Sequence, residues 1–240
     1  MSLWHAELKA GRALEHLEEL KRELQVYYDA VPCPATLWKR PDIGRRFLRF
    51  DFKDLPDRTY LLVGDFAHNL RASLDYVVYT LIVKATGNPP ASTGIQWPVQ
   101  KTKDDGNFKR QTKDVPQLAA DLIETFQPYH DGVKFKEHWL WQVHKLDIID
   151  KHRRIAINQQ AFDMCCPTFS PKAGHLVVKG DRFIEFSYPI EVPPVEVLYN
   201  DRPVIEFGAS EEDLFLKVER LEELYRIVVA DVMPKFGQFF

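Results

Sequence analysis

Apolar residues recur every three or four positions over two long segments in the first part of the chain, and this spacing predicts two long helices. The first helix covers 3–29 and ends before the prolines of "VPCPATLW". The second runs from Asp57, a natural N-cap, to about Lys84, where "TGNPP" breaks the pattern. A short strand-like segment, "FLRFDFKDLPD", lies between them.

Shorter helices are predicted near 116–127 and 136–157, with "QPYHDG" between them. The segment that precedes them, 87–115, is polar and rich in proline, glycine and lysine. This composition is typical of surface segments, so we expect 87–115 to be an ordered but irregular loop.

The period of the pattern changes to two after about residue 173, which predicts strands. "HLVVKGDRFIEFSY" predicts one β-hairpin around Gly180-Asp181, and "VEVLYNDRPVIEF" predicts another around Asn200-Asp201. Because side chains alternate along a strand, one side of this region can face the helices. We expect the functional residues to lie on the helices and not in this β region. A last helix is predicted over 210–235, with Ser210 as its N-cap and Pro234 at its end.

These elements predict the α+β class, as a mainly α-helical bundle with a small antiparallel β-sheet inserted before the C-terminal helix. The bundle would comprise 1–160 and 210–235, and the β-hairpin region would comprise 173–207. A β region of this size is too short to bury a core of its own, so we expect a single domain over 1–240.

Composition and charge then narrow the class of protein. The 240 residues are 45% hydrophobic and 28% charged, with a formal net charge of -3, so nucleic acid or a membrane would need a local patch to bind. No apolar run approaches the roughly 20 residues that span a bilayer, and the charged start "MSLWHAELKAGRALEH" lacks the apolar segment of a signal peptide. We expect a cytoplasmic protein with no membrane partner and with three reduced cysteines.

Polar residues interrupt the apolar face of the helix predicted over 136–157. In "WLWQVHKLDIIDKHRRI", Leu140 and Val143 mark one face, and His144, Asp147 and Lys151 lie in the middle of it. An ordinary amphipathic helix keeps such groups outside, because burial of an unpaired charge is costly. We therefore expect these side chains to pair with polar groups of a second helix.

The predicted partner is the helix that contains "GDFAHNLRASLDYVVYTL". A ridge of His68, Arg71 and Asp75 flanks its apolar stripe at spacings that place the three side chains together. We expect Arg71 to pair with a carboxylate, an aspartate to orient His144, and Asp75 or Asp147 to neutralise Lys151. With the histidine at the end of the later helix, the candidate site comprises His68, Arg71, Asp75, His144, Asp147, Lys151 and His152.

Three interpretations of this cluster stay open. A satisfied ion-pair network would fix helix register without a substrate. A metal-free site would perform acid/base chemistry or cleave a phosphodiester, because clustered charges shift pKa values as proton transfer requires. A metal site would use the same histidines and aspartates, although the chain has no H-E-x-x-H or Glu-x-x-His pattern. Our prediction includes no metal and no cofactor.

Two motifs in these helices carry a resemblance. The first comprises Gly64-Asp65, His68-Asn69-Leu70-Arg71 and Leu74-Asp75, and the second comprises Leu146-Asp147 and Ile149-Asp150-Lys151-His152-Arg153. Together with "QPY" at 127–129, they resemble a group of bacterial and phage proteins without established activity, whose motifs read G-D-x-x-H-N-L-R-x-x-L-D-H and L-D-x-I-D-K-H-R. The resemblance covers about 60–160.

The first motif is also similar to the R-x-x-x-x-H signature of HEPN domains, many of which are metal-independent ribonucleases of toxin and antiphage systems. Arg71 matches this signature, whereas Tyr76 stands at its histidine position, so proton transfer would fall to His68, His144 or His152. The resemblance implies a ribonuclease in which Arg71 stabilises a phosphate-like anion, with RNA or another phosphodiester as its partner. A homo-oligomer is left open.

The alternative function is a non-catalytic binding or scaffold protein whose polar cluster holds the fold. Exposure of His68, Arg71 and His152 in a concave pocket would favour the enzyme, and complete burial with every partner satisfied would favour the scaffold.

Overall fold

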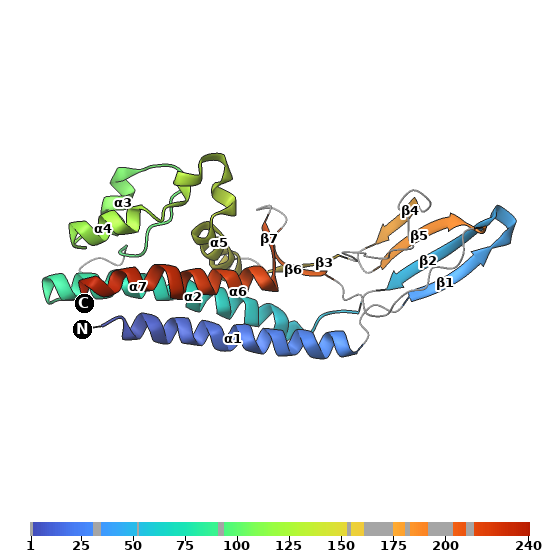
Figure 1. Cartoon of the computed structure of the whole chain (residues 1–240), viewed down its shortest axis with the longest axis horizontal. Coiled ribbons are helices and arrows are strands. Elements are labelled where there is room, and N and C mark those ends of the chain that lie inside the picture. The colour runs from blue at the N-terminus through green and yellow to red at the C-terminus, as the bar shows by residue number, and fades with distance from the viewer. Residues whose placement is uncertain are drawn as a thin grey trace. The chain divides into compact units, whose positions relative to one another are not determined.

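The chain is mainly helical with small antiparallel sheets, which confirms the predicted α+β class (Figure 1). The computed structural model describes residues 2–30, 35–51, 53–90, 94–152, 155–160, 175–180, 183–191, 204–209 and 214–240. The chain divides into two compact units: one comprises Met1–Lys21, Tyr60–Ile157 and Phe207–Phe240, and the other comprises Arg22–Thr59 and Asn158–Glu206. The single domain expected from the sequence stays a prediction.

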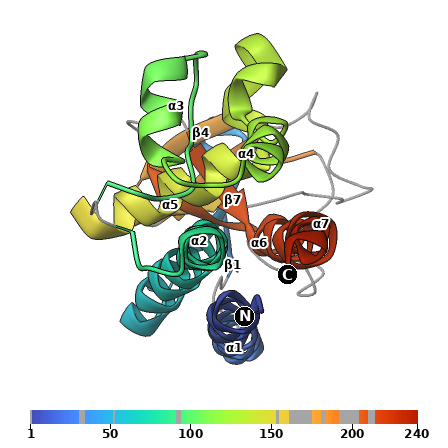
Figure 2. The same cartoon turned by 90° about the vertical axis from the view of Figure 1, so that its left-hand side faces the viewer.

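Two long helices form the base of the first unit, as the hydrophobic spacing predicts. Helix α1 spans Trp4–Asp29 and helix α2 spans Asp57–Thr86, and within this unit they run side by side with the C-terminal helices (Figures 1 and 2). Helix α2 ends where Gly87 adopts a φ of 73°, and the Gly87 N–H donates to the Val83 carbonyl at 2.8 Å. The predicted stripe of α2 is at most 1% exposed, and it comprises Phe66, Leu70, Leu74, Val77 and Leu81.

Three shorter helices and a 3-10 segment cover one side of α2. Helix α4 spans Gln117–Glu124, the 3-10 segment η2 spans Pro128–Glu137, and helix α5 spans Trp139–His152. The expectation that 87–115 is irregular throughout is wrong, because helix α3 spans Asp105–Gln111. The Asp104 carboxylate caps α3 by accepting from the Asn107 N–H at 3.1 Å, so an N-cap begins a helix within a polar segment.

The C-terminal part begins as a strand and continues as a helix. Strand β7 spans Leu214–Lys217, helix α6 spans Val218–Arg226, the π-helical segment η4 spans Ile227–Val232 and helix α7 spans Met233–Phe236. The helix therefore starts at Val218, and Ser210 does not cap it; Ser210 itself lies outside the described residues. Pro234 does not end the helix either, because the Met233 N–H donates five residues back to Val228 and the wide turn accommodates a proline.

Strands from two distant parts of the sequence build the sheet of the second unit. Strands β1 (Ala35–Arg40), β2 (Arg45–Asp51), β5 (Phe183–Pro189) and β4 (His175–Gly180) lie in the order β1-β2-β5-β4, and all pairs are antiparallel. This confirms the first predicted hairpin, and Leu48, Phe50 and Tyr188 are buried. The packing of these strands on the helices stays a prediction.

The second predicted hairpin falls largely on 192–203, outside the described residues. Its last part forms strand β6 (Val204–Ala209), which lies between β3 (Ala156–Gln160) and β7 in a three-stranded sheet. No helix that the structure describes combines the length and the apolar character needed to cross a membrane.

Candidate functional site

A glycine lets the two motif-bearing helices approach each other closely. Gly64 of α2 lies opposite Asp150 of α5, and a Cβ atom built on Gly64 would lie only 2.0 Å from Asp150 Oδ1. Any larger residue at position 64 would therefore push the two helices apart or displace the carboxylate. Burial raises the pKa of Asp150, and the charges of Asp65 and Asp147 raise it further.

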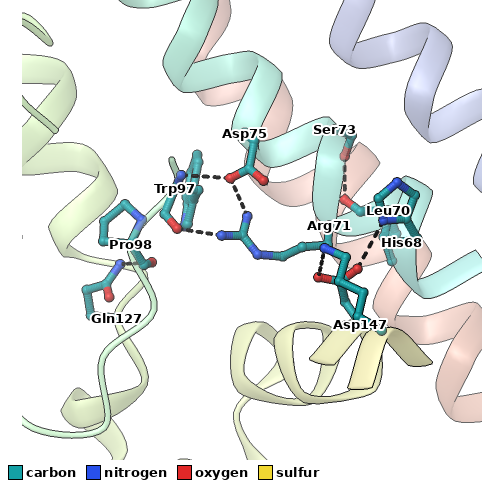
Figure 3. Close-up of polar contacts among 10 residues, drawn as sticks. His68, Leu70, Arg71, Ser73, Asp75, Trp97, Pro98, Gln127 and Asp147 are labelled. Carbon is teal, nitrogen blue, oxygen red and sulfur yellow. Dashed lines mark hydrogen bonds and ion pairs between the residues drawn. The ribbon is translucent and has the colours of Figure 1, made fainter. Parts of the chain in front are cut away.

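The close approach places one carboxylate of α5 against a histidine of α2. His68 Nδ1 lies 3.1 Å from Asp147 Oδ1 (Figure 3), and the Lys151 ammonium donates to Asp147 Oδ2 at 2.7 Å. The Asp147 side chain is only 5% exposed, whereas those of His68 and Lys151 are 46% and 45% exposed. The buried carboxylate therefore orients a half-exposed imidazole beside a half-exposed cation.

The contact with Asp147 selects one tautomer of the His68 imidazole. A carboxylate that accepts from Nδ1 favours the tautomer with its hydrogen on Nδ1, which leaves Nε2 as the basic nitrogen. Among the described residues, none makes a hydrogen bond to His68 Nε2. An exposed substrate can therefore exchange a proton with this nitrogen.

Arg71 and Asp75 form a separate group, a closed clamp around the Trp97 backbone. Arg71 Nη1 donates to Asp75 Oδ1 at 2.7 Å, and Arg71 Nη2 donates to the Trp97 carbonyl at 2.7 Å (Figure 3). The Trp97 N–H donates to the same Asp75 oxygen at 2.8 Å, which completes a ring of three bonds. Arg71 is 3% exposed and Trp97 is fully buried. Burial raises the pKa of Asp75, and the Arg71 charge opposes that rise.

The side chain of Gln127 bonds to the backbone that follows Trp97 and so extends the clamp. Gln127 Nε2 donates to the Pro98 carbonyl at 3.0 Å, and Gln127 Oε1 accepts from the Gln100 N–H at 3.2 Å. Sequence reasoning missed the Trp97 backbone and Gln127 as members of the cluster. The "QPY" match at 127–129 was a signal for Gln127, whereas a backbone amide leaves no trace in the sequence.

His144 does not receive the carboxylate that the sequence predicts for it. Asp147 contacts His68 instead, and His144 Nδ1 is buried without a hydrogen-bond partner in the part of the chain that the structure describes. Burial lowers the pKa of His144 to about 4, and the positive charge of Arg71 adds to the effect. His144 is thus neutral at pH 7.

The structure brings the predicted residues together in two groups instead of one. The first group is His68, Asp147 and Lys151, and the second is Arg71 and Asp75 with Trp97. The expected pairing of Arg71 with a carboxylate is confirmed, and Lys151 pairs with Asp147, one of the two aspartates predicted for it. His152 is exposed at the end of α5, and no hydrogen bond among the described residues joins it to either group.

The described residues contain no group of three or more His, Cys, Asp or Glu side chains arranged to hold a metal ion. Comparisons with protein-family models, with curated proteins and with solved structures found no significant match to this chain.

Proposed function

We propose that the chain is a metal-independent ribonuclease, or a related phosphodiester-cleaving enzyme, whose general base is His68. The observation that carries the proposal is the contact between the half-exposed His68 imidazole and the buried Asp147 carboxylate at 3.1 Å. A buried carboxylate that orients an accessible imidazole is an arrangement used for proton transfer, because it fixes the tautomer and stabilises the imidazolium that forms. RNA is proposed as the substrate from the partial resemblance to the HEPN motif, in which Arg71 matches and Tyr76 replaces the histidine.

The proposed reaction needs one base and one cation. His68 Nε2 removes the proton of an RNA 2′-hydroxyl, and the 2′ oxygen attacks the adjacent phosphorus. The bond from phosphorus to the 5′ oxygen breaks, and this oxygen leaves with a proton from water. The products are a 2′,3′-cyclic phosphate and a 5′-hydroxyl end, and the imidazolium returns its proton to solvent.

Lys151 is the better candidate for binding the phosphate. Its side chain is 45% exposed beside the His68 and Asp147 pair, so an anion can approach it. Arg71 was expected in this role, but its side chain is 4% exposed and its Nη1 and Nη2 atoms are engaged by Asp75 and Trp97. This arrangement supports a structural role for Arg71 and an electrostatic role for Lys151.

The experiment measures cleavage of a fluorescently labelled single-stranded RNA by the purified chain in the presence of EDTA. We expect His68→Ala to lower kcat by about a hundredfold or more, and Asp147→Asn to lower it by about tenfold or more. Lys151→Ala should chiefly raise KM, because it removes a charge that attracts substrate. Circular dichroism of each variant verifies that it folds.

His130→Ala is the matched control. His130 has a side chain that is also 46% exposed, and it lies 3.4 Å from a carboxylate oxygen of Glu124, so it resembles His68 without the buried aspartate. Its removal should leave cleavage unchanged. Equal effects of His68→Ala and His130→Ala would contradict the proposal, and activity that disappears only with EDTA would favour a metal site.

The second candidate function is a non-catalytic binding or scaffold protein, and the closed clamp around Trp97 favours it. The Arg71 guanidinium, the Asp75 carboxylate and the Trp97 backbone bond to one another, as members of a structural network do. Absence of RNA cleavage by the wild-type chain, with or without divalent cations, would support this function.

A further inference from the structure

A cavity beside the Arg71 and Asp75 pair has no part in the proposed reaction. It has a volume of about 530 Å³, within the range of small-molecule sites, and it lies between α1, α2 and the segment that leads to Trp97. His5, Asp75, Tyr76, Tyr79 and Ile95 line it. Three of these five side chains are aromatic rings.

The rings form a wall suited to stacking. The His5 and Tyr76 rings are nearly parallel, with centroids 6.2 Å apart and an interplanar angle of 20°, and Tyr79 lies 6.4 Å from Tyr76. Trp4 packs edge-on against His5 with a centroid distance of 4.9 Å. Tyr76, Tyr79 and Trp4 are 37%, 45% and 56% exposed. Aromatic faces left open to solvent in this way can stack on a planar ligand.

Asp75 adds a hydrogen-bond acceptor to this wall. Its Oδ1 atom is engaged by Arg71 and Trp97, whereas its Oδ2 atom accepts no hydrogen bond from the described residues. The side chain is 37% exposed. Because Arg71 balances its charge, Asp75 suits a neutral donor such as an amino group on a planar ring better than a free cation.

A second cavity adjoins the first and carries positive charge. It has a volume of about 280 Å³ and shares His5 and Tyr76 with the first, and Lys9, Arg12 and Asn69 also line it. The Lys9 ammonium donates to Asn69 Oδ1 at 3.3 Å, and no acidic residue that the structure describes forms an ion pair with it. Among the described residues, Arg12 forms an ion pair with the exposed Glu15, and such a surface pair is weak enough for an anion to displace.

We propose that the two cavities bind one nucleotide, with an amine-bearing base stacked on Tyr76 and its phosphate at Lys9 and Arg12. The base amino group donates to Asp75 Oδ2. The source of the nucleotide is a single-stranded RNA or a free mononucleotide, which present the same base and phosphate. The RNA source rests on the proposed function, because it makes this site a substrate subsite of the ribonuclease.

The test measures binding to the His68→Ala chain, which keeps RNA intact if the proposed function holds. AMP is titrated by calorimetry and a labelled oligoadenylate by fluorescence anisotropy. We expect Tyr76→Ala to weaken binding by about tenfold or more, because stacking on one aromatic side chain contributes that much. Tyr76→Phe should bind as well as the parent, and Lys9→Ala should reduce the dependence of affinity on salt.

The control is Leu61→Ala, another exposed side chain of α2 that is 66% exposed and lies outside both cavities. Binding of AMP and oligoadenylate identifies a nucleotide site, and binding of oligoadenylate alone identifies the RNA chain as the source. Failure of both ligands to bind, or equal binding by the Tyr76→Ala and Leu61→Ala chains, would overturn the proposal. The proposal would also fail if light scattering shows a dimer of the parent chain and Tyr76→Ala dissociates this dimer without weakening nucleotide binding.

The two proposals fail separately. If the wild-type chain cleaves RNA and Tyr76→Ala weakens the binding of neither AMP nor oligoadenylate, the nucleotide site is wrong and the ribonuclease stands. If oligoadenylate binds through Tyr76 and no RNA is cleaved, the ribonuclease is wrong and the nucleotide site stands.

Discussion

Replacement of Arg71 by methionine tests whether the clamp around Trp97 holds the fold. Methionine fills a similar volume but donates no hydrogen bond, so Asp75 loses its cation and the Trp97 carbonyl loses its donor. Removal of one partner from a fully buried ion pair costs about 3–5 kcal/mol. Because the Asp75 side chain is 37% exposed, water can solvate part of its charge, and we expect a loss of about 2–4 kcal/mol.

Urea unfolding followed by circular dichroism and tryptophan fluorescence measures this loss. A decrease of about 3 kcal/mol lowers the unfolding midpoint by roughly 1 M urea for an m value near the upper end of the usual range. Asp75→Asn should cost less, because its amide oxygen still accepts from Arg71 and from the Trp97 N–H. A double-mutant cycle of Arg71→Met and Asp75→Asn should give a coupling energy of about 1–3 kcal/mol.

Arg12→Met is the matched control for this measurement. Arg12 also pairs with an acidic residue on its own helix, but the two side chains are 59% and 65% exposed, so its loss should change stability by no more than about 0.5 kcal/mol. Equal effects of Arg12→Met and Arg71→Met would refute the structural role. Arg71→Lys keeps the positive charge but cannot bridge both acceptors. If this variant folds and binds RNA less tightly than the wild type, Arg71 takes part in anion binding after all.

Two further predictions concern the contact between α2 and α5. Burial lowers the pKa of His144 from 6.5 to about 4, so the folded chain should lose about 3 kcal/mol of stability as the pH falls from 6.5 toward 4. Above pH 6.5 this stability is fully present. Urea unfolding of His144→Phe over the same pH range should lack this loss. Gly64→Ala should lower the free energy of unfolding by about 1–3 kcal/mol, and adding Asp150→Ala should remove the clash and restore most of this loss. The control is Gly11→Ala, whose added Cβ has no atom within 4 Å and which should stabilise the chain by about 0.5–1 kcal/mol in the same assay.

Much of the helical framework follows from local patterns in the sequence. The apolar stripe of α2 is buried as predicted. Two ion pairs join residues four positions apart on the same helix: Arg71 and Asp75 on α2, and Asp147 and Lys151 on α5. Such pairs depend on helix geometry alone. The start of the C-terminal helix was missed, because strand pairing with β6 overrides the helical pattern of 214–217.

The choice of partner for Asp147 could not be predicted in the same way. His144 lies one turn away on the same helix and His68 lies on another helix, and both are within the predicted cluster. Asp147 contacts His68 because the two helices approach closely where Gly64 meets Asp150. The depth of that approach depends on packing across the whole interface, and no local pattern encodes it.

The two polar groups differ in a way that bears on function. Arg71 is buried, and its Nη1 and Nη2 atoms donate to Asp75 and to Trp97, so a substrate has little access to its charge. His68 is anchored through one nitrogen, and its other nitrogen makes no hydrogen bond within the described residues. The same imidazole therefore contacts a buried carboxylate on one side and is half-exposed to solvent. The clamp therefore supports the scaffold on which the His68 and Asp147 pair can act.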